Sequence, residues 1–532
     1  MLIIIILCSL FCHSSLSDDS KELTIKDIDL LTATITDLQQ ALHSNQITSY
    51  NLVKSYLERI KKVNNELHAI IETNPDALDQ ASKLDQERND NKDAKRSPLH
   101  GIPLLIKDNI ATDDKMNTTS GSFALLGSKV PRDADVIYRL RKVGAIILGK
   151  TSMSEWSASR TTNQTREGWS ARGGVSKSAY VENGDPCGSS SGSAIATSIG
   201  LCAAALGTET DGSIVCPSSR ASLVGIKPTV GLTSRAGVIP VSHSQDSVGP
   251  MGKTVRDVAL LLEAIQGIDP RDNATLNIDA VRPNNYTQFL LGTEGFKNMR
   301  LGVVRYGVFY NYTTSESDIM SEEQIQSAND AIELMKHYGA YIEDPANIQN
   351  IENINNGTSE SVVLKTEFKQ DIEVYLSKLQ NTNIKTLADL IQFNNDNKQL
   401  EFTEYMPDHN LFEASENTTG YNSSKYTEAL ATNLRLGRTE GIDYTLDKYN
   451  LDALIMIGDG ASSTAAIAQY PIISVPLGYL TENNGINKTL TGTPYGILFI
   501  SRAWREDILL RVAHAFEQAT HVRDRVRPKY AI

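Results

Sequence analysis

The sequence predicts an α/β protein, because short apolar segments of strand length alternate with helical patterns along much of the chain. This alternation runs from about Gly101 to Val255, and three further strand-length segments follow at 453–457, 472–476 and 496–500. Strands that alternate with helices are typical of a sheet covered by helices. With 532 residues, 40% of them hydrophobic, the chain is long enough and apolar enough to build a large core.

The N-terminal region, 27–92, carries two amphipathic helical patterns. Apolar residues recur there at intervals of three and four, which is the spacing of one helix face. The first face consists of Ile35, Leu38 and Leu42, and the second of Val53, Tyr56, Leu57 and Ile60. We therefore expect two helices that pack against the sheet.

The second half of the chain is less regular in its pattern. An apolar helix is expected at 256–265, a strand at 301–306 and a closing helix at 509–519. The polar, Asn-rich stretch from about 310 to 450 is expected to be mostly helical with insertions. The three strand-length segments beyond it then return the chain to the sheet.

Two Gly/Ser segments, 188–193 and 207–213, are the most informative part of the sequence. Glycine beside serine permits backbone conformations in which hydroxyls and N–H groups converge on one point, as an oxyanion hole requires. Such segments are often flexible surface loops. Here the stretch 194–206 between them consists largely of small and apolar residues and is interpreted as a buried helix. Both serine segments are therefore expected to be fixed at the ends of a core element.

Lys107 follows the apolar run 102–106, at the end of a predicted strand. Burial disfavours an ammonium group and lowers its pKa, so a buried lysine can act as a neutral base. A serine hydroxyl needs such a base before it attacks a carbonyl. The alternative is an ordinary lysine that reaches solvent or pairs with Asp108, and Lys107 taken alone favours that alternative.

Two other motif matches have weaker support. Residues 144–151 fit the phosphate-loop pattern of nucleotide-binding proteins, but the inner residues are apolar and a helical pattern precedes them, so a buried strand is the better interpretation. Residues 188–192 fit a nucleophile elbow with Ser190 at its centre. That site needs a histidine, and none of the available ones lies in a sequence context that suggests catalysis: His243, His337, His409, His514 and His521. His243 is expected to be a structural loop residue.

The cysteines do not suggest a disulfide scaffold. Cys187, Cys202 and Cys216 lie beside the serine segments, and an odd number of cysteines cannot all pair. Cys202, within an apolar run, is expected to behave as a small core residue. A thiolate nucleophile at Cys187 or Cys216 is a rival hypothesis, but neither cysteine has a basic partner in view.

Several segments together resemble the amidase signature family, and within it the peptide amidases and their fungal relatives. These segments occur in the family's order between about Asp27 and Arg527, and they include GIPLLIKDNI, GAIILGKTSMSEW, DPCGSSSGSA, GTETDGSIVCPSS and YPIISVPLGY. The resemblance implies a mixed central β-sheet surrounded by α-helices, in a single domain over 18–532. It also implies that the variable stretch from 310 to 450 shapes the substrate channel.

The resemblance further implies a Ser-cisSer-Lys triad. Ser213 matches the nucleophile, Ser189 the bridging serine on a cis peptide bond, and Lys107 the base. The backbone N–H groups of Thr210, Asp211, Gly212 and Ser213 match the oxyanion hole. The implied reaction forms an acyl-enzyme on Ser213, releases ammonia or an amine, and ends with hydrolysis by water. No cofactor is expected.

The residues around the nucleophile differ from the commoner family pattern, and this difference bears on the expected substrate. Many members carry GGSIR around the nucleophile, whereas this chain carries DGSIV, with Asp211 in place of a glycine and Val215 in place of the arginine. The DGSIV form resembles the peptide-amidase branch. The resemblance therefore favours a peptide or C-terminal amide as substrate.

The N-terminal segment and the N-glycosylation sequons predict a secreted protein. An apolar segment at 2–12, followed by Ser15-Leu16-Ser17, resembles a secretory signal peptide cleaved at about residue 17. Nine N-x-S/T sequons are consistent with secretion: Asn117, Asn163, Asn273, Asn285, Asn311, Asn356, Asn417, Asn422 and Asn487. Asn117, near the expected catalytic core, is the one least expected to carry sugar.

Charge and composition also bear on partners. The net charge of −13 argues against a nucleic-acid partner. No basic amphipathic stretch points to stable membrane association. The histidines are scattered without a metal-ligand spacing, so no metal is expected.

These observations predict a secreted amidase. A glutamine amidotransferase subunit of the same family is an alternative, but it would need partner subunits and an internal compartment, which the signal peptide argues against. A secreted binding protein with an inactive site is the alternative from another class, and the presence of Lys107, Ser189 and Ser213 argues against it.

Overall fold

A mixed β-sheet is the framework of the protein. The computed structural model describes residues 28–91, 94–277, 282–306, 320–457, 462–481 and 491–531. Within these ranges the sheet has 11 strands in the order β1-β3-β2-β6-β8-β7-β12-β13-β11-β9-β10. In that order they span Ile70–Thr73, Ile146–Thr151, Pro103–Lys107, Ala204–Glu209, Ser247–Gly252, Val224–Lys227, Ile472–Tyr479, Pro494–Ile500, Ala453–Ile457, Arg300–Val303 and Tyr341–Glu343.

Parallel and antiparallel pairs share this sheet. Strand β2 lies parallel to both β3 and β6, and β9 lies parallel to both β10 and β11. Strand β6 is antiparallel to β8, and β12 is antiparallel to β7 and β13. A short separate ribbon joins β4 (Trp169–Ser170) to β5 (Gly174–Val175). The expected mixed α/β architecture is confirmed.

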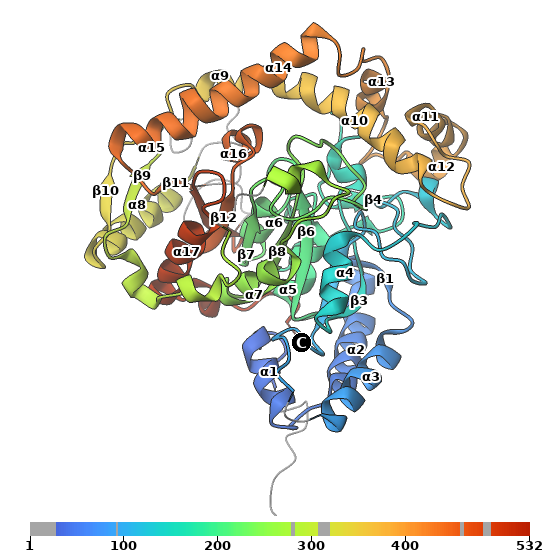
Figure 1. Ribbon diagram of the computed structural model, residues 1–532, viewed down its shortest axis with the longest axis horizontal. Coiled ribbons are helices and arrows are strands. Elements are labelled where there is room, and N and C mark those ends of the chain that lie inside the picture. Colours follow the sequence, from blue (N-terminus) through green and yellow to red (C-terminus); the bar gives the residue numbers. More distant parts are fainter. Residues whose placement is uncertain are drawn as a thin grey trace, which may run out of the picture.

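Helices surround the sheet (Figure 1). The N-terminal and central ones are α1 (Ile35–His43), α2 (Ser49–Leu67), α3 (Ala77–Asp90), α4 (Asp135–Lys142), α5 (Ser191–Ser198), α6 (Val215–Arg220) and α7 (Val255–Ile265). Those that follow are α8 (Glu322–His337), α9 (Ile351–Asn355), α10 (Ser359–Ser377), α11 (Leu387–Asp396), α12 (Lys398–Glu401), α13 (Asn410–Glu416), α14 (Ser424–Leu434), α15 (Asp443–Tyr449), α16 (Ser463–Ala468) and α17 (Glu506–Thr520).

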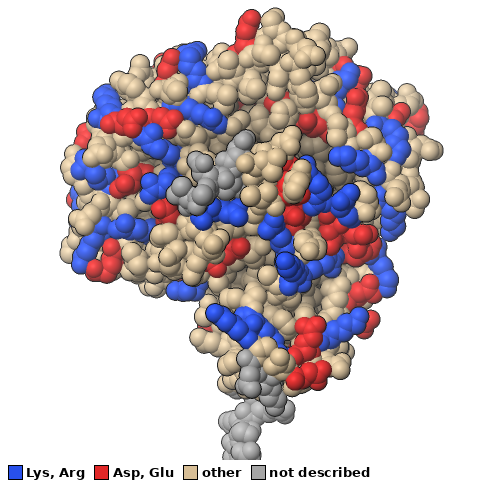
Figure 2. All heavy atoms as spheres, in the orientation of Figure 1, with Lys and Arg blue, Asp and Glu red and all other residues tan. Residues whose placement is uncertain are grey.

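Two groups of helices lie at opposite ends of the view. Helices α1 to α3 lie at the lower end, close to the C-terminus of the chain, whereas α10 and α14 form an arch across the top (Figure 1). The expectation of a mostly helical region between 310 and 450 is confirmed for its described part. None of the helices in the described ranges is both long and apolar enough to cross a bilayer. On the face shown in Figure 2, basic and acidic side chains are interspersed.

Two large clusters of buried side chains form most of the core. One joins strands β2, β3 and β6 to the N-terminal helices, with Leu104, Ile147 and Leu206 packed in the same cluster as Leu52 and Tyr56. The other joins the second half of the sheet to α7, α8 and α17. Burial of this apolar surface supplies the main driving force for folding. It also fixes β2 and β6, the two strands that lead to the site, in the interior.

Most expected elements are confirmed, and three elements differ. The polar helix α3 and strand β1 were not expected, because α3 buries only Ala77 and Ala81 and so lacks a clear apolar stripe. The expected helix over 194–206 ends at Ser198 in α5 and continues as strand β6 from Ala204. Gly200 turns the chain between them with φ +71°, and a Cβ there would lie 2.5 Å from the Leu30 carbonyl oxygen.

The segment that fits a phosphate loop is a strand of the sheet. Residues Ile146–Thr151 form β3, which is buried throughout and follows helix α4. This confirms the interpretation as a buried strand. Its backbone amides are engaged by the neighbouring strands β1 and β2, so they do not form a phosphate-binding cradle.

The proposed signal segment, 1–17, lies outside the described residues, as do the sequons at Asn311 and Asn487.

Candidate active site

Lys107 ends strand β2 inside the sheet, between β3 and β6. Its side chain is completely buried, and its Nζ lies 2.7 Å from Oγ of Ser189 and 3.1 Å from the carbonyl oxygen of Thr208. Burial lowers the pKa of Lys107 to about 7, although the nearby carboxylates of Asp246, Glu209 and Glu167 oppose the shift. A neutral amine is therefore available close to physiological pH.

Ser189 lies in the loop that enters helix α5. The peptide bond between Gly188 and Ser189 is cis, as the resemblance implies. The Ser189 carbonyl accepts a hydrogen bond from the Ser154 backbone N–H at 3.1 Å. Its hydroxyl faces Lys107, so the loop and the strand meet at this pair of side chains.

Ser213 lies in the turn between β6 and α6. The preceding Gly212 has φ +80°, a conformation that glycine adopts without steric cost. The Ser213 carbonyl accepts a hydrogen bond from the Ser190 N–H at 3.1 Å, which joins the two serine segments directly. Among the described residues, the hydroxyls of Ser213 and Ser189 do not form the hydrogen bond that the resemblance implies.

The backbone of this turn presents donors without partners. Within the described part of the chain, none of the four N–H groups of Thr210, Asp211, Gly212 and Ser213 donates a hydrogen bond. Unpaired backbone donors in a largely buried turn are unusual, because such groups are normally satisfied. They are suited to bind a developing oxyanion beside Ser213.

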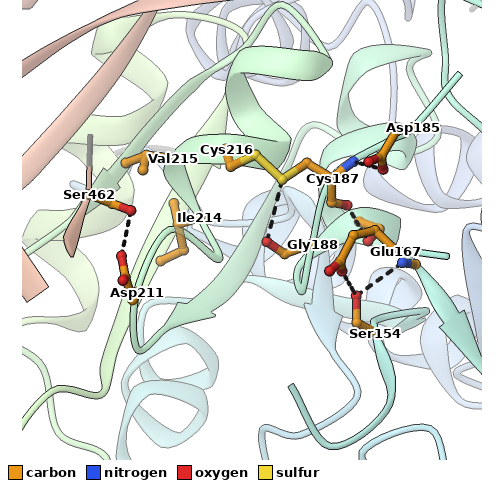
Figure 3. Close-up of a disulfide and its surroundings, with 12 residues drawn as sticks. Ser154, Glu167, Asp185, Cys187, Gly188, Asp211, Ile214, Val215, Cys216 and Ser462 are labelled. Carbon is orange, nitrogen blue, oxygen red and sulfur yellow. Dashed lines mark hydrogen bonds between the residues drawn. A yellow bond between two sulfur atoms is a disulfide. The ribbon is translucent and has the colours of Figure 1, made fainter. Parts of the chain in front are cut away.

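Side-chain hydrogen bonds of Thr210 and Asp211 hold the same turn in shape. The Asp211 carboxylate accepts hydrogen bonds from the hydroxyls of Ser462 and Ser463, and Figure 3 shows the contact with Ser462. The Thr210 hydroxyl donates to Asp246 at 2.6 Å. Burial raises the pKa of Asp246 to about 6, and the hydrogen bonds that it accepts from the Thr210 hydroxyl and from the N–H groups of Ser242 and Val241 counteract the shift. The turn is therefore anchored on both sides.

Comparison with known proteins shows which family the chain belongs to. The amidase family model matches residues 51–510. A probable amidase of Arabidopsis thaliana is 44% identical over 494 residues, which cover 92% of this chain and 90% of the relative. The chain belongs to the amidase family. As a member of this family it is an amidohydrolase.

Solved structures of amidases resemble the fold closely. The peptide amidase of Stenotrophomonas maltophilia is 36% identical, with a TM-score of 0.83, over 94% of this chain and 99% of that one. An amidase family protein of Bacillus anthracis is 31% identical, also with a TM-score of 0.83, over 96% of this chain and 94% of that one. The similarity extends over nearly the whole of both chains.

The geometry disfavours Ser190 as the amidase nucleophile. Its hydroxyl is fully buried, donates to the Thr208 carbonyl at 3.1 Å and accepts from the Thr208 N–H at 3.3 Å. Both interactions tie it to strand β6. His243, one of the histidines that such a site could use, instead contacts Asp371 and Tyr421.

The cysteines differ from the sequence-based expectation. Cys187 and Cys216 form a disulfide with a Cα–Cα distance of 5.9 Å (Figure 3), so neither provides a free thiolate. The odd number of cysteines near the serine segments did not show which of them pair, and among the described residues the free one is Cys202. Cys202 is buried in the core as expected, and burial raises the pKa of its thiol to about 11.

Three acidic residues beside the site were not singled out from the sequence. Glu209 accepts hydrogen bonds from the N–H groups of Ile214 and Val215, at the start of α6. Asp246 accepts a hydrogen bond from the Thr210 hydroxyl. Glu167 accepts from the Ser154 hydroxyl at 2.6 Å, and the Glu167 and Ser154 side chains fill the space where a Cβ on Gly188 would lie. Their pattern offered no distinctive spacing, because their partners are distant in sequence or are backbone groups.

His243, Glu367 and Asp371 are a group whose ligand atoms lie within 4.8 Å of one another, close enough for a metal ion. Hydroxyl donors already surround Glu367: Ser244 at 2.9 Å and Tyr426 at 2.7 Å, with Ser242 closer still. We therefore describe the group as a hydrogen-bonded cluster and give it no part in the chemistry.

Proposed function

We propose that this amidohydrolase cleaves its substrate through an acyl-enzyme on Ser213, with Ser189 as the bridging residue and Lys107 as the base. The observation that carries the proposal is the contact between the buried Lys107 amine and the Ser189 hydroxyl, at 2.7 Å, next to a turn whose four backbone N–H groups donate to none of the described residues. A neutral base, a hydroxyl relay and an oxyanion site are the parts that acyl transfer requires.

In the proposed reaction, neutral Lys107 takes a proton from Ser189 as Ser189 takes one from Ser213. The Ser213 oxygen attacks the amide carbonyl, and the N–H groups of Thr210 to Ser213 stabilise the oxyanion. The same relay then returns a proton to the departing nitrogen, so that ammonia or an amine leaves and the acyl group stays on Ser213. Water, deprotonated through the relay, hydrolyses the ester and restores the enzyme.

A peptide or C-terminal amide is the proposed substrate class. Support comes from the resemblance to the peptide amidase of Stenotrophomonas maltophilia and from Asp211, which departs from the commoner glycine. The Asp211 carboxylate accepts hydrogen bonds from the hydroxyls of Ser462 and Ser463.

Secretion is a further part of the proposal, with 1–17 as signal peptide and 18–532 as one amidase domain. Six sequon asparagines in the described ranges are exposed: Asn163, Asn273, Asn285, Asn356, Asn417 and Asn422. Asn117 is partly buried, and its amide donates to Glu72. The disulfide between Cys187 and Cys216 also supports an oxidising compartment. The N-terminal sequence of protein recovered from culture medium, and its mass before and after enzymatic deglycosylation, test this part.

The activity is tested with a panel of peptide amides, aryl amides and free glutamine, followed by product mass. We expect release of ammonia or amine by the wild type and none by Ser213→Ala. Turnover of glutamine alone would favour the amidotransferase alternative. A folded wild type that hydrolyses no member of the panel would favour the binding-protein alternative.

A further inference from the structure

We propose that the Cys187–Cys216 disulfide is a positioning element for the two active-site serines, and that its reduction by a dithiol slows acyl transfer. The inference rests on the proposed roles of Ser189 and Ser213. Neither cysteine touches the reacting atoms. The bond acts through the two segments that it joins.

The bond lies where these two segments begin and end. Cys187 is two residues before Ser189, and Cys216 is three residues after Ser213, in the first turn of α6. The cross-link therefore closes a loop that contains both serines, helix α5 and strand β6. Figure 3 shows the sulfur bridge directly between the Gly188 loop and the start of α6.

The nucleophile's side of the cross-link is rigid. The Cys216 N–H donates to the Gly212 carbonyl at 2.8 Å. The Glu209 carboxylate accepts hydrogen bonds from the N–H groups of Ile214 and Val215 at 2.7 and 2.9 Å. The Cys216 side chain is only 7% exposed. Because this end of the disulfide is fixed, the cross-link holds Cys187 at a set position relative to the turn that carries Ser213.

The bridging-serine side depends more on the tether. Cys187 has φ +56°, a left-handed conformation that residues other than glycine rarely adopt. Local hydrogen bonds hold it: its N–H donates to Asp185 at 2.8 Å, and its carbonyl accepts from the Ser191 hydroxyl at 2.6 Å. Once the tether is cut, relaxation of Cys187 toward ordinary backbone conformations would displace the adjoining Gly188 and Ser189.

The opposite face of this loop leaves little room for compensation. A Cβ on Gly188 would lie 2.2 Å from Ser154 Oγ and 2.4 Å from Glu167 Oε2, so the loop backbone already packs against these side chains. Within the described residues, three hydrogen bonds join the two serine segments, all through Ser190: its N–H donates to the Ser213 carbonyl, and its hydroxyl exchanges two hydrogen bonds with the backbone of Thr208. The disulfide is thus the covalent link that sets the spacing of the two segments.

Reduction is chemically accessible at one end. Cys187 is partly exposed, so a dithiol can attack its sulfur, which breaks the S–S bond and releases Cys216 as a thiolate. The second thiol of the reagent then displaces Cys187 from the mixed disulfide. The protein gains two electrons and two protons, and the reagent becomes a cyclic disulfide. Cys202 takes no part, because it is buried elsewhere in the core.

The test compares the oxidised and dithiothreitol-reduced wild type, with thiols counted on the folded protein. We expect two additional thiols per chain, unchanged far-UV circular dichroism, a fall in kcat of about tenfold or more, and a KM changed far less. Reoxidation should restore kcat. The double variant Cys187→Ser/Cys216→Ser should have the kcat of the reduced enzyme, and dithiothreitol should not change that kcat. The kcat of Cys202→Ala should fall on reduction, as that of the wild type does.

A second readout keeps the inference separate from the choice of substrate. The rate at which a fluorophosphonate labels Ser213 should fall on reduction in parallel with kcat. Oxidised enzyme that is neither labelled nor active would refute the proposed function itself. Reduced, folded enzyme with kcat and labelling rate within twofold of the oxidised form would refute only the positioning role. Loss of secondary structure together with activity would refute it as well, since the bond would then serve general stability.

Discussion

Nζ of Lys107 lies 2.7 Å from Oγ of Ser189, in a place where both side chains are buried. The contact joins the end of a central strand to a loop more than eighty residues away in sequence. Because burial lowers the pKa of Lys107 to about 7, the protonation state of this pair changes near neutral pH.

The first prediction concerns pH. Lys107 must be neutral to accept a proton, so kcat/KM should fall about tenfold for each pH unit below about 7 and level off above it. Initial rates between pH 5 and 9 with a small amide measure this profile. A flat profile from pH 5 to 7 in a folded enzyme would exclude Lys107 as the titrating base.

The two adjacent serines should respond differently to substitution. Ser189→Ala removes the proposed relay and should lower kcat by roughly a hundredfold to ten-thousandfold. Ser190→Ala removes two hydrogen bonds to Thr208 and should lower the free energy of unfolding by about 1–3 kcal/mol, with much of the activity retained. Urea unfolding and steady-state rates on both variants test the pair. The reverse pattern would revive Ser190 as the nucleophile.

A buried ion network connects the helices over 398–416 with the core. Arg160 contacts Glu155 and, at 3.3 Å, Glu401, and all three side chains are fully buried. Glu401→Ala removes the buried carboxylate that accepts hydrogen bonds from the Ser122 hydroxyl, the Phe123 N–H and Arg160, and should lower the free energy of unfolding by about 3–5 kcal/mol. Glu404→Ala, at an exposed position of the same segment, should change it by less than about 0.5 kcal/mol. Equal effects of the two substitutions in urea unfolding would contradict the assignment.

Gly192 sets how closely α5 approaches strand β3. A Cβ there would lie 2.3 Å from the Ala69 carbonyl oxygen and 2.5 and 2.6 Å from the backbone of Ser152. Gly192→Ala should therefore shift the start of α5 and lower the free energy of unfolding by about 2 kcal/mol or more, with loss of activity.

Gly127→Ala is the matched control for this substitution. Gly127 has φ +82°, but a Cβ at this position would have no atom within 4 Å, so the change tests backbone conformation alone. Its cost should be about 1 kcal/mol, without loss of kcat. Thermal unfolding of both variants gives the comparison, and a neutral Gly192→Ala would show that α5 can move freely.

Much of the site could be predicted from sequence, because its chemistry lies in short contiguous segments. Lys107, Ser189 and Ser213 each fall inside one of these segments, and the structure brings the first two into contact. The contacts that join these segments were harder to predict from the sequence. The disulfide escaped prediction because a count of cysteines cannot choose which two of three pair, and spacing alone carries no geometry.

The misassigned elements have a similar explanation. The stretch 194–206 is composed of small and apolar residues that suit a buried helix or a buried strand equally, so periodicity could not divide it between α5 and β6. Gly200, at the turn between them, was the available signal. Helix α3 lacked the apolar stripe on which the assignment of helices depended, because its buried positions are two alanines.

The most direct test of the account is to trap the acyl-enzyme. Wild-type protein is mixed with an activated acyl substrate such as an aryl amide, quenched in acid within the first turnover, digested and mapped by mass spectrometry. The account predicts the acyl mass on the peptide that contains Ser213, and its absence from Ser213→Ala. Acylation of Ser190 or of a cysteine, or amide turnover that persists in Ser213→Ala, would contradict it.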